Sequence, residues 1–288
     1  MEFFGCNGIY TFEYSMAEAI RNKALCKYYY YPHLVELTNE EMIQYIELSK
    51  KIAKIINRED DDSREILKRL LLKRKQIIHK AENKKSIFED ILKDHREKTG
   101  SLKYTLVYVP EGNQPDDQGA DVFDTIERIK DDEDTIHLIN EYTRIVRDVD
   151  SHIVVRQFTS ESTDRDAILA DFAKGNIDVL TSMKCLDEGV DVPRSEFAIF
   201  CASTGNPRQF IQRRGRVLRT HNDKRFAIIH DLVIPQINFD PDCYELEKSL
   251  VSSEINRVRD FALLSENCND TLDALDDVLN QYQISIFN

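Results

Sequence analysis

The chain has 288 residues, enough for one large domain or two small ones, and 41% of them are hydrophobic, which excludes a wholly disordered chain. Its formal net charge of −13 excludes a surface that is basic overall, although it leaves room for local basic patches. The segment from Asn206 to Arg225 is such a patch, because it holds seven Lys or Arg residues and one Asp.

No apolar run reaches the roughly 18 residues that span a bilayer, and Met1–Ile20 lacks the basic and apolar regions of a signal peptide. The 6 cysteines form no Cys-x-x-Cys pair, so neither a zinc site nor a disulfide framework is indicated. We therefore expect a cytoplasmic protein without membrane contact and without a metal site of its own.

In chain order, the segment 1–38 is mixed in composition, and the segment 39–99 is highly charged and lacks proline. Apolar residues recur there at helical spacings of three and four, namely Met42, Ile43, Ile46, Ile66, Leu67, Leu70 and Leu71. This pattern predicts two long helices in an antiparallel hairpin, with Ser63 capping the second. We interpret the charged faces as solvated helix surface rather than as a dedicated binding arm.

From residue 101 to 235, short β-rich runs alternate with helical patterns. The predicted strands are Tyr104–Val109, His152–Phe158, Ile177–Leu180, Phe197–Cys201 and Phe226–Leu232. The predicted helices between them are Ile136–Val149, Asp164–Lys174 and Pro207–Arg219. Alternation of this kind indicates an α/β fold in which helices cover both faces of a parallel sheet. The residues after this segment, up to the end of the sequence, are acidic and helical in pattern, which predicts a helical C-terminal extension.

The most informative segment, residues 206–219, combines an apolar face and an arginine stripe on one predicted helix. The apolar face carries Phe210, Ile211, Val217 and Leu218, and the stripe carries Gln209, Gln212, Arg213, Arg216 and Arg219. If the apolar face packs on the sheet, the arginines point outward, and their planar, permanently charged guanidinium groups suit a phosphate. Gly215 permits close approach of another backbone, at a helix cost of roughly 1 kcal/mol. We favour phosphate chemistry over a solvated basic helix face.

Residues 179–193 read as a strand, a polar turn, a short helix and an acid before Pro193. Ligands of open α/β sheets lie at the carboxyl ends of strands, where Thr181 and Ser182 fall. Their hydroxyl and N–H groups suit a backbone phosphate, and Asp191 suits a sugar hydroxyl. Taken alone, this segment is better explained as an ordinary turn with capping hydroxyls.

Together the two segments resemble motifs of a known family. Residues 180–193 resemble helicase motif V, and Gln212–Arg219 resembles motif VI, the Q-x-x-G-R-x-x-R signature of superfamily 2. Three weaker likenesses accompany them: Tyr104–Val109 to the motif IV strand, 158–175 to the helix before motif V, and 14–32 to the segment after motif III in restriction-type helicases. The chain thus resembles the C-terminal RecA-like domain of a DEAD/DEAH-like superfamily 2 helicase, similar to type I and type III restriction-enzyme helicase subunits.

The resemblance implies a domain organisation and a fold. We expect a linker segment over 1–38, a helical hairpin insertion over 39–99, the RecA-like domain over 100–236 and the helical extension over 237–288. The fold class is then α/β, a RecA-like parallel sheet with helices on both faces, a long helical hairpin and the C-terminal helices.

The resemblance also implies roles for particular residues. Arg216 and Arg219 would be catalytic arginine fingers on the terminal phosphates of ATP, and Gln212 and Arg213 would help to place the nucleotide or the attacking water. The remaining assignments are Gly189 and Asp191 at the nucleotide, and Thr181 and Ser182 at the nucleic-acid backbone.

The sequence has no Gly-x-x-x-x-Gly-Lys-Ser/Thr loop to hold phosphates. We therefore expect the first motor domain to be absent from this chain, to hold most of the Mg²⁺ that accompanies ATP, and to be needed for hydrolysis. DNA is the expected track, with RNA as the alternative, and restriction or repair subunits are expected partners.

Three rival functions stay open. The first is a non-catalytic module that binds nucleic acid or protein through a RecA-like fold. The second is an interaction scaffold built on the charged hairpin. The third is a metal-dependent nuclease, which the sequence favours least because no His or acid cluster has the required spacing.

Overall fold

The structure is a computed structural model of the chain, and it describes residues 15–58, 60–110, 125–159, 161–183, 192, 194–201, 213–235 and 243–282. Its strands are β1 (Lys27–Leu34), β2 (Thr105–Tyr108), β3 (Val155–Phe158), β4 (Val179–Ser182), β5 (Phe197–Phe200) and β6 (Phe226–Val233). The helices before β3 are α1 (Met16–Arg21), α2 (Asn39–Ile55), α3 (Asp61–Lys80), α4 (Asn83–Thr99) and α5 (Thr125–Val149). Those after it are α6 (Arg165–Lys174), α8 (Tyr244–Ala262), α9 (Cys268–Asp273) and α10 (Asp276–Tyr282).

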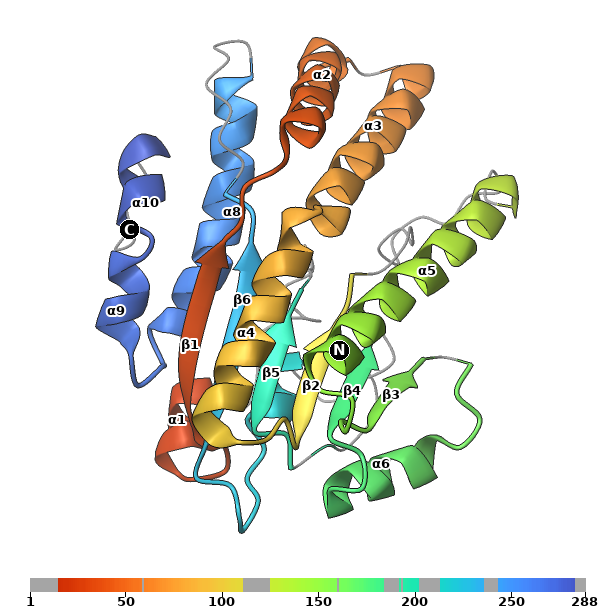
Figure 1. The fold of residues 1–288 in the computed structure, drawn as a ribbon. Coiled ribbons are helices and arrows are strands. Elements are labelled where there is room, and N and C mark those ends of the chain that lie inside the picture. Colours follow the sequence, from red (N-terminus) through yellow and green to blue (C-terminus); the bar gives the residue numbers. More distant parts are fainter. Residues whose placement is uncertain are drawn as a thin grey trace, which may run out of the picture.

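The six strands form one sheet in the order β1-β6-β5-β2-β4-β3, and every described pairing is parallel (Figure 1). The α/β fold and the parallel sheet predicted from the alternating pattern are therefore confirmed. Strands β2, β4 and β5 have four residues each, and all of these residues are buried, as expected of strands that helices cover on both faces.

Strand β1 was not among the predicted strands, although it pairs with β6 over eight residues, from Lys27↔Phe226 to Leu34↔Val233. Its Tyr28–Tyr31 run shows no polar alternation, and Pro32 argues against a central strand. The proline is tolerated because β1 lies at the edge of the sheet. The segment 1–38 thus contributes a strand to the sheet.

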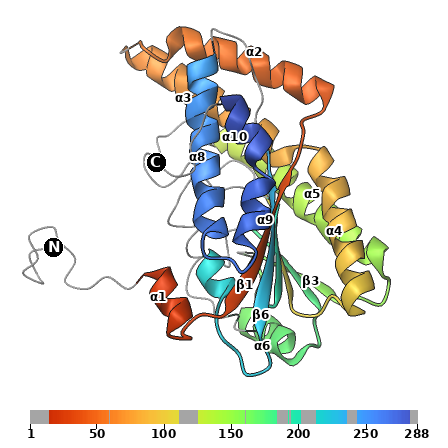
Figure 2. The ribbon, with the colours of Figure 1, turned by 90° about the vertical axis from the view of Figure 1, so that its left-hand side faces the viewer.

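Two apolar cores lie on the two faces of the sheet (Figure 2). On one face, Phe88, Ile91 and Leu92 of α4 and Tyr142 of α5 pack on the strands. On the other face the core is built by residues of α6, α8 and α10, including Phe172, Phe261 and Tyr282. Both faces are therefore covered, and the carboxyl ends of the strands stay available for a site.

The predicted hairpin is formed by α2 and α3. Helix α2 begins at a capping box, with Thr38 as the N-cap residue and Glu41 as its partner. Helix α3 begins earlier than predicted, because Asp60 accepts the hydrogen bond from the Ser63 N–H and is the N-cap. Ala81, with ψ 125°, then bends the chain into α4, which leaves the hairpin and packs on the sheet.

Helices α8 to α10 are the predicted C-terminal extension, and they also close the outer edge of β1. The Asn267 side chain accepts from the N–H of Tyr30 and donates to its carbonyl, each at 2.9 Å. Thr271 donates to the same carbonyl, and the Glu266 N–H donates to the Tyr28 carbonyl. Edge strands need such protection, since unpaired backbone groups recruit other strands. Among the described residues, none of the helices has the length and apolarity to cross a membrane.

The sequence makes two local predictions for α6, a C-cap at Gly175 and a capping box of Thr163 with Asp166, and they had different outcomes. Gly175 ends the helix in the left-handed conformation, with φ 76°, as predicted. The N-cap is Asp164, whose side chain makes no capping hydrogen bond, so the capping box predicted at Thr163 is wrong.

Candidate functional site at the carboxyl edge of the sheet

The candidate site lies where the parallel strands end. The registers place Tyr108 of β2 beside both Ser182 of β4 and Phe200 of β5, and Phe200 beside Asp231 of β6. These four residues therefore mark one edge of the sheet, the position at which open α/β sheets bind ligands.

A short helical turn at residues 213–217 extends from this edge, where Arg213 lies over Tyr108, towards the amino ends of the strands. Val217 and Leu218 are fully buried in the core on the α8 face, which confirms these two residues of the predicted apolar face, while Phe210 and Ile211 lie outside the described residues. The Leu218 carbonyl accepts a 2.8 Å hydrogen bond from the Cys26 N–H, and Leu25 forms a bridge with Arg219. The turn is thereby fixed to the start of β1.

The arginines of this turn are covered rather than directed into solvent, so the predicted outward stripe is wrong for Arg213 and Arg216. Arg213 is only 3% exposed, and its guanidinium lies 5.3 Å from the ring centre of Tyr108. Arg216 is 8% exposed. Tyr108, which covers Arg213, comes from a distant part of the chain, and helical spacing cannot reveal such a contact.

Arg214, which the sequence analysis did not assign, is an internal anchor. Its guanidinium lies 4.5 Å from the Phe261 ring centre, and its Nη1 donates to the Asp260 carbonyl at 2.8 Å. Burial lowers the pKa of Arg214, and burial raises the pKa of the neighbouring Tyr28 to about 12. Arg214 thus joins the turn to α8.

Arg219 lies at the end of the turn and is only partly buried. The Nζ of Lys224 donates to the carbonyls of Val217 and Arg219. A lysine at this position satisfies carbonyls that the helix end leaves without partners. The structure thus fixes the backbone that carries both predicted arginine fingers.

Gly215 has open space beside it, since a Cβ atom added there would meet no atom within 4 Å. The close approach predicted for this glycine is therefore not made by the described chain. The open side lies directly beside the backbone of Arg214 and Arg216, where another domain or a phosphate group has room to approach.

Thr181 and Ser182 lie at the end of β4, as predicted, but both are fully buried. The Thr181 hydroxyl is 3.0 Å from that of Thr143 on α5, and Ser182 Oγ donates to the Met183 carbonyl. Their assignment to a nucleic-acid backbone stays a prediction. Gln212, Gly189 and Asp191 lie outside the described residues.

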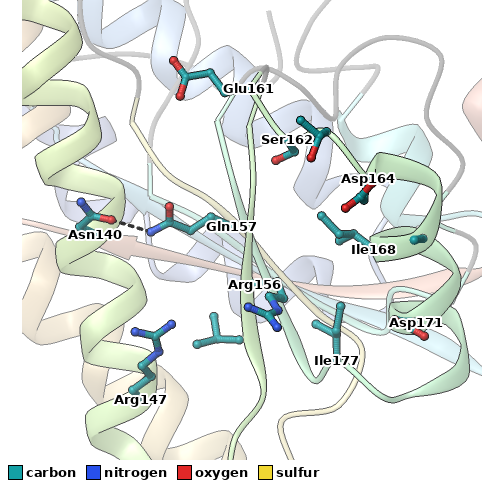
Figure 3. Close-up of a pocket in the computed structure, with 13 residues that line it drawn as sticks. Asn140, Arg147, Arg156, Gln157, Glu161, Ser162, Asp164, Ile168, Asp171 and Ile177 are labelled. Atoms are coloured by element: carbon teal, nitrogen blue, oxygen red, sulfur yellow. Dashed lines mark hydrogen bonds between the residues drawn. The ribbon is translucent and has the colours of Figure 1, made fainter.

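A hollow of about 680 Å³ beside the edge strand β3 was not predicted (Figure 3). Arg147 of α5 and Arg156 of β3 line it, together with Gln157, whose side chain donates to Asn140 at 2.8 Å. Its other side carries the acidic residues Glu161, Asp164 and Asp171. The mixed charge gives this hollow less affinity for phosphate than a uniformly basic surface has.

A buried acid at the carboxyl edge was also missed. Asp231 is fully buried, accepts from the Tyr30 hydroxyl at 2.8 Å and pairs with Arg257 of α8. Glu254 also pairs with Arg257, and this attraction to the two acids raises the pKa of the guanidinium despite its burial. The network ties α8 to β1 and β6, and its one sequence signal was an acid inside an apolar strand.

The sheet and the arginine-bearing turn define an α/β domain of the RecA-like type. Residues 120–221 match the helicase conserved C-terminal domain. This stretch is therefore a helicase C-terminal domain, and the predicted resemblance is confirmed at this level.

The chain is 39% identical over 77 residues to the DNA 3′-5′ translocase XPB2 of Sulfurisphaera tokodaii, a stretch that covers 27% of this chain and 17% of that protein. The chain thus spans only a small part of this relative. Among solved structures it is similar to the SWI2/SNF2 ATPase core of Sulfolobus solfataricus in complex with double-stranded DNA. The identity is 14%, the TM-score is 0.52, and the match covers 90% of this chain and 50% of that one.

A fragment described as an HsdR subunit of a type I restriction enzyme from Vibrio vulnificus is also similar, with 16% identity and a TM-score of 0.48. That match covers 80% of this chain and 36% of the other. At these identities the structural likenesses show the fold alone.

Proposed function

We propose that this chain is the second motor domain of an ATP-dependent DNA translocase or helicase and works with a first motor domain. The observation that carries the proposal is the helical turn at 213–217, which packs on the sheet with Arg213 over Tyr108 at the carboxyl edge and leads to Arg219 beside the start of β1. The match to the helicase C-terminal domain and the 39% identity to a DNA translocase support it.

In this proposal, Arg216 and Arg219 contact the terminal phosphates of ATP and stabilise the negative charge that develops during phosphoryl transfer. Such arginines are worth about 10³–10⁵ in rate in related chemistry. Arg213, held over Tyr108, helps to orient the nucleotide together with Gln212. Gly189 and Asp191 complete the nucleotide side, and Thr181 and Ser182 lie nearest the nucleic acid.

The described residues fit half of an ATP site. The open space beside Gly215 leaves room for phosphate groups or for the partner domain. The arginines supply positive charge, and we assign most of the Mg²⁺ ligands to the first motor domain. We therefore expect the isolated chain to hydrolyse ATP poorly.

The test joins this chain to its first motor domain and measures DNA-stimulated ATP hydrolysis. Arg216→Ala and Arg219→Ala should each lower the turnover rate at least 100-fold, because each removes charge at the reacting phosphate. Arg225→Ala is the matched control, since Arg225 is an exposed arginine just before β6 to which the proposal gives no role. Unchanged turnover in both finger variants would show the assignment to be wrong.

The second candidate is a non-catalytic binding module, and the burial of Arg213 and Arg216 favours it, because covered arginines can serve the fold alone. Nucleotide-independent DNA binding that Arg216→Ala leaves unchanged would select this function. Restriction or repair subunits remain proposed partners for either function.

A further inference from the structure

We propose that the outward face of α3 is a phosphate-binding arm, which contacts the backbone of the nucleic acid on which the motor acts. This inference rests on the proposed function and adds a surface to it. The sequence pattern alone favoured a solvated helix surface, and the position and support of α3 in the structure change that interpretation.

The first observation is charge. Between residues 64 and 80 lie seven Lys or Arg residues and one Glu, so this stretch carries +6 while the whole chain carries −13. The remaining residues must therefore carry −19. One basic residue, Arg74, is buried, and the other six lie on the rest of the helix surface: Arg64, Lys68, Arg69, Lys73, Lys75 and Lys80.

The second observation is the arrangement of these charges on the helix. Ser63 and Arg74 mark the buried side of α3, and the six cations lie around the opposite half of the turn. The acids on that half are Glu65 and, in the first turn, Asp61 and Asp62, so the cations still outnumber them two to one. Within the described ranges, exposed Lys68 and Lys73 make no hydrogen bond and no ion pair. Like charges this close on a helix repel, and an anionic partner removes the repulsion.

The third observation is the position of the hairpin relative to the candidate site. The hairpin of α2 and α3 lies beyond the carboxyl ends of β1 and β6, on the side of the sheet where the candidate site lies (Figures 1 and 2). Nucleic acid held at that edge passes within reach of this surface. A basic helix at the opposite edge would have no such access.

The fourth observation is the rigid support of the arm. Glu247 of α8 is fully buried and accepts hydrogen bonds from the Tyr45 hydroxyl at 2.6 Å and from Ser49 Oγ at 2.7 Å. Arg74 donates to Ser49 at 3.2 Å and lies 3.5 Å from Glu247. This network holds both helices of the hairpin on α8, so the backbone that carries the cations is fixed before a ligand arrives, which lowers the cost of binding.

The test uses the 288-residue chain and measures binding to fluorescent 30-base-pair duplexes of DNA and of RNA over a range of salt concentrations. The double variant Lys68→Gln/Lys73→Gln should bind on the order of 10- to 60-fold more weakly at 0.1 M salt. Its plot of log K against log salt should be flatter by about 1.8, since each lost phosphate contact removes about 0.9. The two duplexes show whether DNA or RNA supplies the phosphates.

The matched control is Lys103→Gln/Lys174→Gln, which removes two exposed lysines next to the amino ends of β2 and β4. It should keep the affinity within 2-fold and leave the salt slope unchanged. Equal affinities and slopes in the two double variants would overturn the proposal, and so would wild-type binding that does not depend on salt.

The failure of the arm can be told apart from the failure of the motor. If the Lys68→Gln/Lys73→Gln variant loses binding while Arg216→Ala leaves ATP hydrolysis unchanged, the arm stands and the motor assignment fails. If the Lys68→Gln/Lys73→Gln variant keeps its binding while Arg216→Ala lowers ATP hydrolysis, only the arm is rejected. Thermal unfolding of each variant checks that the exposed replacements leave the fold intact.

Discussion

Lys84, near the start of α4, should destabilise the folded chain, so its replacement by methionine should stabilise it. The side chain is fully buried, and in the part of the chain that the structure describes its Nζ has no hydrogen-bond partner. Burial lowers the pKa of Lys84 from 10.5 to about 8, although Cys201, Glu254 and Asp231 raise it in part. At neutral pH the ammonium group is therefore charged at an unfavourable site.

The magnitude follows from the shift in pKa. A difference of one pH unit corresponds to about 1.4 kcal/mol, so at pH 7 the buried charge costs about 3 kcal/mol. Because the folded chain releases the proton first, the wild type gains stability as the pH rises from 8 towards 10.5. Methionine keeps the unbranched shape without the charge, so Lys84→Met should add up to about 3 kcal/mol at pH 7 and only about 1 kcal/mol at pH 9.5.

Urea unfolding of the wild type and of Lys84→Met at pH 7 and pH 9.5 measures both effects. Lys54→Met is the matched control, because Lys54 is exposed on α2 and its replacement should change the free energy of unfolding by less than about 0.5 kcal/mol. A Lys84→Met variant that is less stable than the wild type at pH 7, or an advantage that does not change with pH, would refute the reasoning.

Three further variants test the fold by urea unfolding. Gly215→Ala should raise the free energy of unfolding by about 0.5–1 kcal/mol, because a Cβ there meets no atom within 4 Å; a loss would mean that the space is filled. Glu247→Ala should lower it by roughly 3–5 kcal/mol, since buried Arg74 loses its counter-charge; a change below 1 kcal/mol would contradict the network. Burial lowers the pKa of both His230 and His33, so the wild type should lose stability as the pH falls below 6.5. The His230→Leu variant should lose less stability over the same pH range. Equal losses in the two proteins would exclude protonation of His230 as the cause.

Much of the fold could be predicted from local pattern, because apolar spacing reports which face of an element is buried. The runs at Tyr104–Val109 and Phe197–Cys201 are strands for that reason, and the spacing from Met42 to Leu71 produces the two helices of the hairpin. Strand β1 could not be predicted in this way. Its partner β6 lies about 200 residues further along the chain, and the pairing depends on that distant edge.

The candidate site could likewise be predicted only in part. The sequence identified the arginine segment and its apolar residues, because helical spacing alone places Val217 and Leu218 on one face. It could not show that Tyr108 covers Arg213 or that Phe261 covers Arg214, since those contacts join separate elements.

By itself, the sequence determined the class of the fold, the order of five of its strands along the chain and the motifs of the helicase C-terminal domain. These are properties of residues that are close together in the chain. Only the tertiary structure decided which charges are buried, where the hairpin lies and which residues pair across the sheet. The physical reason is that burial and charge pairing depend on neighbours in space, and folding brings Arg74 to Glu247 and Asp231 to Arg257 from far apart.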